Sequence, residues 1–314
     1  MNSWWLLLYR KNFLKALFSC YIEGVEVIAL EPYGFCEGVS RAFEMAEEAL
    51  QKGHPFYALG LVVHNEKVIN SLRERGMISL DEKNGTLESL LRSVPDGSTV
   101  LFSAHGHDPK LDGIAKEKHL VTIDATCPFV KGNMDRIKWA LEKGDSVIYI
   151  GNKGHLECEA ALSLGNHVYL YEKTINGLRP GYWAISDKRP YVVSQTTMDE
   201  EEVDSAYKDI LSRYPEAIYA GGRCPSTVKR QTSVIEAPRD VDLFVILGSE
   251  RSNNTVRLAS LAMSTHPSAD VLRVLDKKDL EAADLFRYRK AALASGASTD
   301  PATYKEVLEY LKMI

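Results

Sequence analysis

The sequence predicts an α/β protein built from three similar modules, each with a small and mostly parallel sheet covered by helices. Two observations lead to this prediction. Short apolar runs rich in β-branched residues alternate along the chain with segments of helical period, which is typical of parallel sheets flanked by helices. In addition, Cys36, Cys127 and Cys224 recur at the same place in that alternation, 91 residues from the first to the second and 97 from the second to the third.

The expected elements follow in chain order. Eight apolar runs are the predicted strands: VEVIAL, FYALGLVV, STVLFSA, HLVTID, DSVIYI, YVVSQ, VDLFVIL and KAALAS. Helices are expected between the strands, and the clearest cover residues 39–50, 130–143, 200–214 and 301–313.

Each of the three cysteines closely follows an apolar run and precedes a helical segment. The runs before Cys36 and Cys127 are strong, and the run AIYAGG before Cys224 is weaker. Each cysteine is therefore expected in a loop at the carboxyl end of a strand, beside a helix N-terminus. Ligands bind at this edge in open α/β sheets.

Other polar residues keep a fixed spacing from the cysteines. His64, His155 and Ser252 each lie 28 residues after one of them. His105 and Thr196 each lie 69 residues after one, and the corresponding residue in the third segment is Ser298, at 74. Each module thus presents one cysteine and two polar loop tips at the same strand edge, and pseudo-threefold packing would bring the three edges to one centre.

This spacing also divides the chain. We expect an N-terminal extension over residues 1–24 and α/β modules over 25–126, 127–222 and 223–314, the last with the C-terminal segment. The extension has no acidic residue before Glu23. A targeting peptide, an amphipathic surface helix and translated sequence upstream of the usual start are the alternatives for it.

Composition limits the class of protein. A net charge of −5 over 314 residues argues against a broad basic surface for nucleic acid. There is no apolar run of the length that a membrane span needs. Five cysteines, an odd number in a long chain, point away from a disulfide framework and toward metal-binding or catalytic thiols in a reducing compartment, so we expect the protein in the cytoplasm.

Three widely separated cysteines suit an iron–sulfur cluster with one iron left open for a substrate atom. Structural zinc usually takes four ligands, and these three cysteines form no CxxC pair. An open iron can act as a Lewis acid, and a cluster can pass electrons one at a time. The neighbouring helix N-termini would favour a negatively charged cluster and any phosphate.

The polar tips predict a phosphate or diphosphate pocket, lined by His64, His105, His155, Ser252, Asn254 and Ser298. Glu157, two residues after His155, is expected at the rim of the same centre near Thr196, where a carboxylate and a hydroxyl can relay protons. A solvated glutamate at a helix start is the alternative. The remaining histidines are expected to be packing or surface residues, and Cys158 is expected to pack beneath the site without binding the cluster.

Nine segments, in order, resemble the 4-hydroxy-3-methylbut-2-enyl diphosphate reductase family of the non-mevalonate isoprenoid pathway. They are PYGFCEGVSRA, VVHNEKVINSLRERG, FSAHG, IDATCPFV, GHLE, SQTT, CPSTVKRQ, GSERSNNTVRL and SGASTDP. Any one of them alone is weak, but together they extend from about residue 25 to the end of the chain.

The resemblance implies a trefoil of three α/β modules around a central [4Fe-4S] cluster bound by Cys36, Cys127 and Cys224. It also implies that Glu157 passes protons to the substrate hydroxyl and that Thr196 is its hydrogen-bonding partner. The residues that would hold the diphosphate are His64, His105, His155, Thr196, Ser252, Asn253, Asn254 and Ser298.

The implied reaction removes the hydroxyl of 4-hydroxy-3-methylbut-2-enyl diphosphate as water, with two electrons and two protons, to give isopentenyl and dimethylallyl diphosphate. A ferredoxin or flavodoxin type partner would supply the electrons. A cluster-dependent hydratase, which needs no external reductant, is a second enzyme class that uses an open iron. A non-catalytic cluster or metal protein such as a redox sensor is a third, although it has no need of a diphosphate pocket.

The sequence departs from the family pattern at several positions. His107 and Asp108 stand where Val-Ser is common, Leu156 replaces a Pro, Ala160 replaces a Gly, and Pro225-Ser226 replace an Ala-Thr type pair. Asn253 stands where a serine contacts the diphosphate in relatives, and its amide still offers a donor. None of these changes removes a cluster ligand or the proposed acid.

Overall fold

The computed structural model describes residues 25–53, 55–171, 173–174, 177–178 and 185–314. Residues 1–24, with Cys20, and His54 lie outside the described residues, so the alternatives for the N-terminal extension are not addressed by the fold. No helix formed by the described residues combines the length and the apolar character that a membrane span needs.

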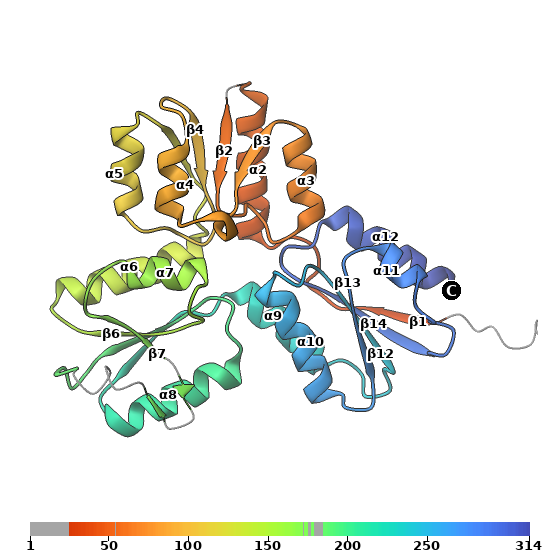
Figure 1. Ribbon diagram of the computed structural model, residues 1–314. Coiled ribbons are helices and arrows are strands. Elements are labelled where there is room, and N and C mark those ends of the chain that lie inside the picture. The colour runs from red at the N-terminus through yellow and green to blue at the C-terminus, as the bar shows by residue number, and fades with distance from the viewer. Residues whose placement is uncertain (1–24, 54, 172, 175–176, 179–184) are drawn as a thin grey trace, which may run out of the picture.

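Three lobes surround a common centre (Figure 1), and each contains a four-stranded parallel sheet. The predicted α/β architecture of small parallel sheets is therefore confirmed. A short antiparallel pair, β8 (Lys173–Thr174) with β9 (Gly177–Leu178), is added to the second lobe.

The first sheet has the strand order β3-β2-β4-β5. Its strands are β2 (Phe56–Leu59), β3 (Met77–Leu80), β4 (Thr99–Phe102) and β5 (Val121–Asp124). One face packs against α2 (Glu37–Gln51) and α3 (Glu66–Glu74), and the other against α4 (Leu87–Ser93) and α5 (Lys110–Glu117). A 3-10 turn, η1 (Glu82–Asn84), follows β3.

The second sheet has the order β7-β6-β10-β11. Its strands are β6 (Val147–Ile150), β7 (Val168–Tyr171), β10 (Tyr191–Ser194) and β11 (Ile218–Gly221). Helices α6 (Pro128–Glu142) and α7 (Leu156–Leu162) cover one face, and α8 (Glu200–Arg213) covers the other.

The third sheet has the order β13-β12-β14-β1. Its strands are β1 (Glu26–Ala29), β12 (Leu243–Leu247), β13 (Asp270–Val274) and β14 (Lys290–Ser295). Helices α9 (Pro225–Ile235) and α10 (Asn253–Thr265) cover one face, and α11 (Lys277–Glu281) and α12 (Pro301–Met313) the other.

One strand departs from the expected module boundaries. β1 lies within residues 25–126, yet it pairs with β14 in parallel, Glu26 opposite Lys290 and Ala29 opposite Leu293. The first strand of the chain therefore completes the sheet of the last lobe. The repeat seen in the sequence could not show this, because each cysteine follows the outer strand of one sheet and begins the first helix of the next lobe.

Besides the short pair β8 and β9, three strands of the parallel sheets were not expected from the sequence: β3, β7 and β13. All three are edge strands with only one neighbour in their sheet, and all carry partly exposed residues in the sequences MISL, VYLY and DVLRV. An edge strand needs a weaker apolar pattern than a central one, so its signal is easily missed.

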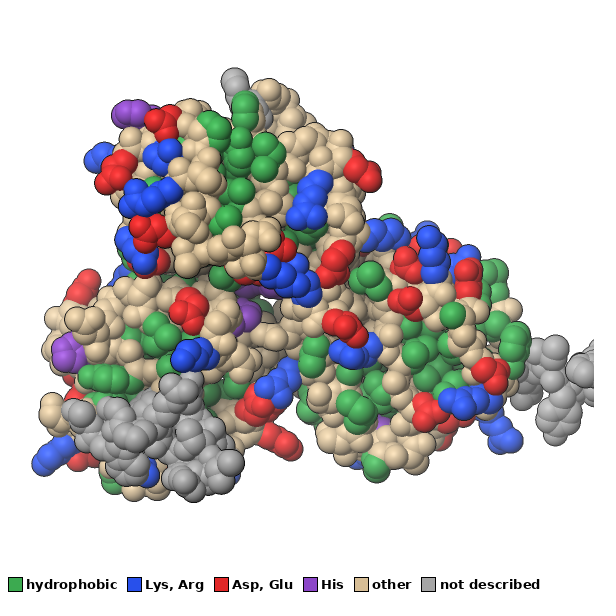
Figure 2. All heavy atoms as spheres, in the orientation of Figure 1, with side chains coloured by type: hydrophobic (Ala, Val, Ile, Leu, Met, Phe, Trp, Pro, Cys, Tyr) green, Lys and Arg blue, Asp and Glu red, His purple; other side chains and the backbone are tan. Residues whose placement is uncertain are grey.

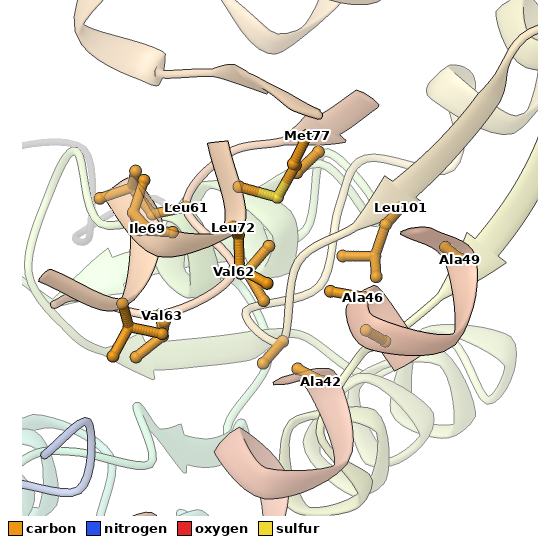
Figure 3. Packing of buried hydrophobic residues seen from close by; sticks show 14 of the residues in the cluster. Ala42, Ala46, Ala49, Leu61, Val62, Val63, Ile69, Leu72, Met77 and Leu101 are labelled. Atoms are coloured by element: carbon orange, nitrogen blue, oxygen red, sulfur yellow. The ribbon is translucent and has the colours of Figure 1, made fainter. Parts of the chain in front are cut away.

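The core of the first lobe shows how a helix is brought close to its sheet. Ala42, Ala46 and Ala49 are spaced as one face of α2 and are buried against Leu72, Met77 and the other residues of the cluster (Figure 3). Small side chains at this spacing let the helix approach the strands closely. The position of α2 in turn fixes Cys36, which directly precedes it.

Arg230 anchors the segment that leads to Cys36. Its side chain is 2% exposed and donates hydrogen bonds to three carbonyl oxygens: Pro32 at 2.8 Å, Gly34 at 2.8 Å and Ser295 at 2.9 Å. The guanidinium thereby joins α9 to β14 and to the loop after β1. A buried cation with three acceptors is costly to lose, because the acceptors would remain unpaired.

Replacing Arg230 with Met is expected to lower the free energy of unfolding by about 3 kcal/mol, roughly 1 kcal/mol for each carbonyl left without a donor. Urea denaturation measures the change. Arg92→Met is the matched control, because Arg92 bonds Glu88 on an exposed helix face and should cost less than about 1 kcal/mol. Equal effects in the two variants would show that the buried hydrogen bonds of Arg230 add nothing.

Candidate functional site

A cavity with about 690 Å³ of empty space, part of it open to solvent, lies where the three lobes meet. Figure 2 shows histidine side chains at this meeting point. The cavity is lined by all of the residues that the sequence singled out: Cys36, His64, His105, Cys127, His155, Glu157, Thr196, Cys224, Ser252, Asn253, Asn254 and Ser298. Residues far apart in the chain meet here because the carboxyl ends of all three sheets face inward.

The three cysteines occupy equivalent positions. Cys36, Cys127 and Cys224 are the N-cap residues of α2, α6 and α9, and none makes a side-chain cap hydrogen bond. Their sulfurs are therefore available to bind a group in the cavity. The backbone N–H groups of the first helical turn lie toward the sulfur, at Val39 for Cys36 and at Phe129 for Cys127, and favour the thiolate.

Burial raises the pKa of the Cys36 and Cys127 thiols, and the other cavity thiols raise it further because neighbouring negative charges repel. A bound metal cation would favour the thiolate forms of Cys36 and Cys127, because metal ligation requires a deprotonated sulfur. A Cβ on Gly38 would lie 2.6 Å from Cys127 Sγ, so the absence of a side chain there makes room for this sulfur. The donor set fits a metal group held from three sides.

Cys158 is separate from this set. It lies on α7, is fully buried in the core that α6 and α7 form with the second sheet, and is not among the residues that line the cavity. All four cysteines in the described ranges are free of disulfide bonds. The placement agrees with the expectation that Cys158 packs beneath the site.

The three cavity histidines form one cluster. A ring nitrogen from each of His64, His105 and His155 lies within 4.8 Å of the others, and His64 Nε2 is 3.1 Å from His105 Nε2. Burial, and then repulsion between the rings, lowers the pKa of His64 and His105 to about 3 and that of His155 to about 4. All three are neutral near pH 7 and can offer N–H groups to an anion.

The orientation of His155 follows from its place in the chain. It is the N-cap of α7, and its Nδ1 accepts a hydrogen bond from the backbone N–H of Glu157 at 3.2 Å. In the neutral ring the proton is then on Nε2. His155 is therefore a donor at its outer nitrogen.

Several buried polar atoms of the cavity have no partner among the described residues. They are Nδ1 of His64 and both side-chain amide atoms of Asn254, a residue 5% exposed. Ser252, the N-cap of α10, accepts from Thr255 N at 3.4 Å. Unpaired buried polar groups are costly and uncommon, so this side of the cavity is built to hydrogen bond a ligand.

Glu157 is not a solvated glutamate at a helix start, and that alternative is wrong. The residue is 1% exposed, and its carboxylate accepts from Thr196 N at 2.9 Å, Thr196 Oγ1 at 2.7 Å and Tyr149 Oη at 3.2 Å. Burial raises its pKa to about 7, against these hydrogen bonds, which lower it. A carboxyl group with this pKa can release and take up a proton near neutrality.

Some residues around the cavity carried no sequence signal. Tyr149 lies inside a predicted strand, where a tyrosine is an ordinary core residue. Asn65 directly follows His64, and in that segment only the histidine had the spacing that marked a site residue. The side-chain amide of Asn65 donates to Ser298 O at 3.1 Å and so links the first and third lobes. Ser226 and Thr227 line the cavity in the first turn after Cys224, which the register of that helix could have indicated.

Four of the residues that depart from the family pattern are not among those that line the cavity: His107, Asp108, Leu156 and Ala160. His107 stacks on Phe102 with ring centroids 4.0 Å apart, and Leu156 and His107 line a separate groove. Asn253, in contrast, lines the cavity beside Asn254. Of the other histidines, His266 is buried and bonded to Ala237 O at 3.0 Å.

Known proteins resemble the chain over almost its whole length. A family model described as "LytB protein" matches residues 27–312. Two similar relatives, from Anoxybacillus flavithermus and Bacillus subtilis, are 36% identical over 291 residues and 35% over 294, covering 92% of this chain and 90% and 91% of theirs. Both are named 4-hydroxy-3-methylbut-2-enyl diphosphate reductase.

Solved structures agree. A reductase structure from Plasmodium falciparum has a TM-score of 0.79 at 27% identity, covering 91% of this chain and 87% of that one. A second, described as the terminal enzyme of the non-mevalonate pathway, has a TM-score of 0.65 at 26% identity, with 92% and 100% covered.

Replacing Asn254 with Ala is expected to weaken the binding of inorganic diphosphate about five- to tenfold, since one buried hydrogen-bonding group contributes roughly 1 kcal/mol. Calorimetric titration measures the affinity. Asn70→Ala on α3 is the control, because Asn70 lies outside the cavity and should leave binding unchanged. An unchanged affinity in Asn254→Ala would contradict a role of the unpaired amide in anion binding.

Proposed function

The chain belongs to the LytB family of 4-hydroxy-3-methylbut-2-enyl diphosphate reductases, and on this basis we propose that it reduces this diphosphate to isopentenyl and dimethylallyl diphosphate. The main structural support is that one cavity is lined by three cysteine sulfurs, by unpaired groups that can bind an anion and by a buried acid. The hydroxyl leaves as water, and two electrons and two protons balance the change. Because the named relatives are reductases, the hydratase and sensor alternatives lose their support.

Members of this family are iron–sulfur enzymes. We propose that Cys36, Cys127 and Cys224 hold a [4Fe-4S] cluster, with one iron free of protein thiolate. When bound, the cluster supplies a Lewis-acidic iron for the substrate oxygen and delivers electrons one at a time. In support of this, the three cysteines lie at three helix N-termini around the cavity, and their sulfurs make no capping hydrogen bond.

The diphosphate would be held by the polar side of the cavity. The proposed contacts come from His64, His105, His155, Thr196, Ser252, Asn253, Asn254 and Ser298. The neutral histidines offer N–H donors, and the N-terminus of α10 adds its dipole. An approaching anion would also favour the protonated form of these rings, so its charge can be matched without a fixed cation.

Glu157 is the proposed source of protons for the leaving hydroxyl. Its pKa of about 7 keeps much of it protonated at neutral pH. Thr196 Oγ1 lies 2.7 Å from Glu157 Oε2, and both residues line the cavity. The hydroxyl of Thr196 can accept from the acid and donate toward the substrate, which makes the pair a short proton relay.

The reaction consumes two electrons, and a cluster passes one at a time. We therefore propose an external one-electron carrier of the ferredoxin or flavodoxin type as the donor. Free cluster-binding thiols persist where thiols are kept reduced, so we propose the cytoplasm as the compartment. Fractionation of cells followed by immunoblotting tests the location, and reduction assays with purified carriers test the donor.

Purification and cluster reconstitution without oxygen are expected to give a brown protein that reduces the hydroxylated diphosphate with an artificial electron donor. Cys36→Ser should lose most of the iron and the turnover, because one of three ligands is gone. Cys158→Ser is the control, since this residue does not line the cavity, and it should keep the iron. Zinc in place of iron, or full iron in Cys36→Ser, would contradict the proposed site.

Glu157→Gln is expected to keep the iron content and lower kcat about 10²- to 10⁴-fold, which is the usual effect of removing a general acid. In the unmodified protein kcat should fall as the pH rises through about 7, where Glu157 loses its proton. Steady-state kinetics from pH 5.5 to 9, about 1.5 units or more on each side of that pKa, measure both effects.

Glu159→Gln is the matched control for this measurement. Glu159 lies on the same helix, is exposed and accepts only from Gly154 N at 2.9 Å in the hydrogen bonds seen around it. It should keep the rate and the pH profile. A near-normal rate in Glu157→Gln would exclude the proton-relay role.

A further inference from the structure

We infer that Tyr149 is a positioning residue for Glu157: with the backbone N–H of Thr196 it holds Oε1 as an acceptor, so that the acidic proton resides on Oε2 beside the Thr196 hydroxyl. The inference rests on the proposed role of Glu157. It concerns which of the two carboxyl oxygens carries the acidic proton toward Thr196, and which residue determines that choice.

The hydrogen bonds around the carboxyl group are unequal. Oε1 receives two donors, Thr196 N at 2.9 Å and Tyr149 Oη at 3.2 Å. Among the described residues, Thr196 Oγ1 bonds Oε2 at 2.7 Å, and the side-chain amide of Asn133 is a further donor close to the carboxyl group. A backbone N–H can only donate, so a proton on Oε1 would face another proton, whereas a proton on Oε2 meets a hydroxyl that can accept it.

Tyr149 acts through Glu157 and not on a ligand. It is 0% exposed on β6 and is absent from the residues that line the cavity, whereas Glu157 and Thr196 both line it. Burial raises the pKa of the Tyr149 hydroxyl well above its ordinary value, so the group remains a neutral donor. Gly151 makes room for the ring, because a Cβ there would lie 2.7 Å from the ring carbon Cε1.

Within the described part of the chain, the groups that hydrogen bond the Glu157 carboxyl are Thr196, Tyr149 and Asn133, and none of them is a cation. Besides Tyr149 from β6 and Thr196 after β10, the groups around Glu157 are His155 and Cys158 of the α7 segment and the amide of Asn133 from α6. His155 is neutral near pH 7. The nearest cation that the hydrogen bonds reach is Arg136, which donates to Asn133 Oδ1 at 3.0 Å. Hydrogen bonds therefore carry the stabilisation of the Glu157 carboxylate.

Tyr149→Phe removes the hydroxyl and keeps the ring, so it separates the hydrogen bond from the packing. The carboxylate should become less stable, and the titration midpoint of Glu157 should rise by about 0.5–1 pH unit, as expected for one hydrogen bond. Infrared spectroscopy of the resting holoenzyme follows the carboxyl C=O stretch, identified by its absence in Glu157→Gln. This readout does not depend on turnover.

The kinetics of Tyr149→Phe should change in parallel with the infrared titration. We expect kcat to fall about three- to tenfold, KM to stay unchanged, and the alkaline limb of the pH profile to move upward with the infrared midpoint. Tyr207→Phe is the control in the same lobe, because its hydroxyl donates to Ala217 O at 2.8 Å and should shift neither quantity.

A fluorinated tyrosine at position 149 provides a second test with the opposite sign. A more acidic phenol is a stronger donor, so the Glu157 midpoint should fall, even if the phenylalanine variant folds poorly. An unmoved midpoint in either form would overturn the inference and leave Tyr149 as a core side chain. If the protein showed no reductase activity, the midpoint would still decide the role of Tyr149, and only the proposed function would fail.

Discussion

The convergence of three cysteine-capped helices on one point is the constraint on which the rest of the structure depends. Cys36, Cys127 and Cys224 each stand between the outer strand of one sheet and the first helix of the next lobe. The chain can bring them together only if the carboxyl ends of three parallel sheets face one centre. β1 closes the circle by completing the third sheet, which ties the start of the chain to its end.

The chemistry of the cavity depends on burial balanced by hydrogen bonds. The partly buried histidines lose their charge, the buried carboxyl of Glu157 retains its proton toward neutrality, and the partly buried thiols of Cys36 and Cys127 resist ionisation. Each shift follows from removing a charge from water. The groups are therefore prepared for partners that bring the missing charge: a cationic metal group for the sulfurs and an anionic ligand for the histidines.

Residues that do not line the cavity also fix the positions of those that do. Arg230 orients the loop before Cys36, Asn65 holds the backbone of Ser298, and Tyr149 lies beneath Glu157. All three are buried polar side chains in ordinary helix, loop or strand segments. Their roles come from the geometry of partners distant in sequence, so no local pattern identifies them.

The sequence by itself determined the fold class, the three cysteines and the polar tips that accompany them, because strand and helix periods and a repeat spacing are local properties. It missed the edge strands β3, β7 and β13, whose half-exposed residues weaken that pattern. Only the tertiary structure decided that β1 belongs to the third sheet, that Glu157 is buried and that Tyr149 bonds it. Pairing, burial and hydrogen-bond partners depend on which distant segments meet, and spacing along one chain does not specify this.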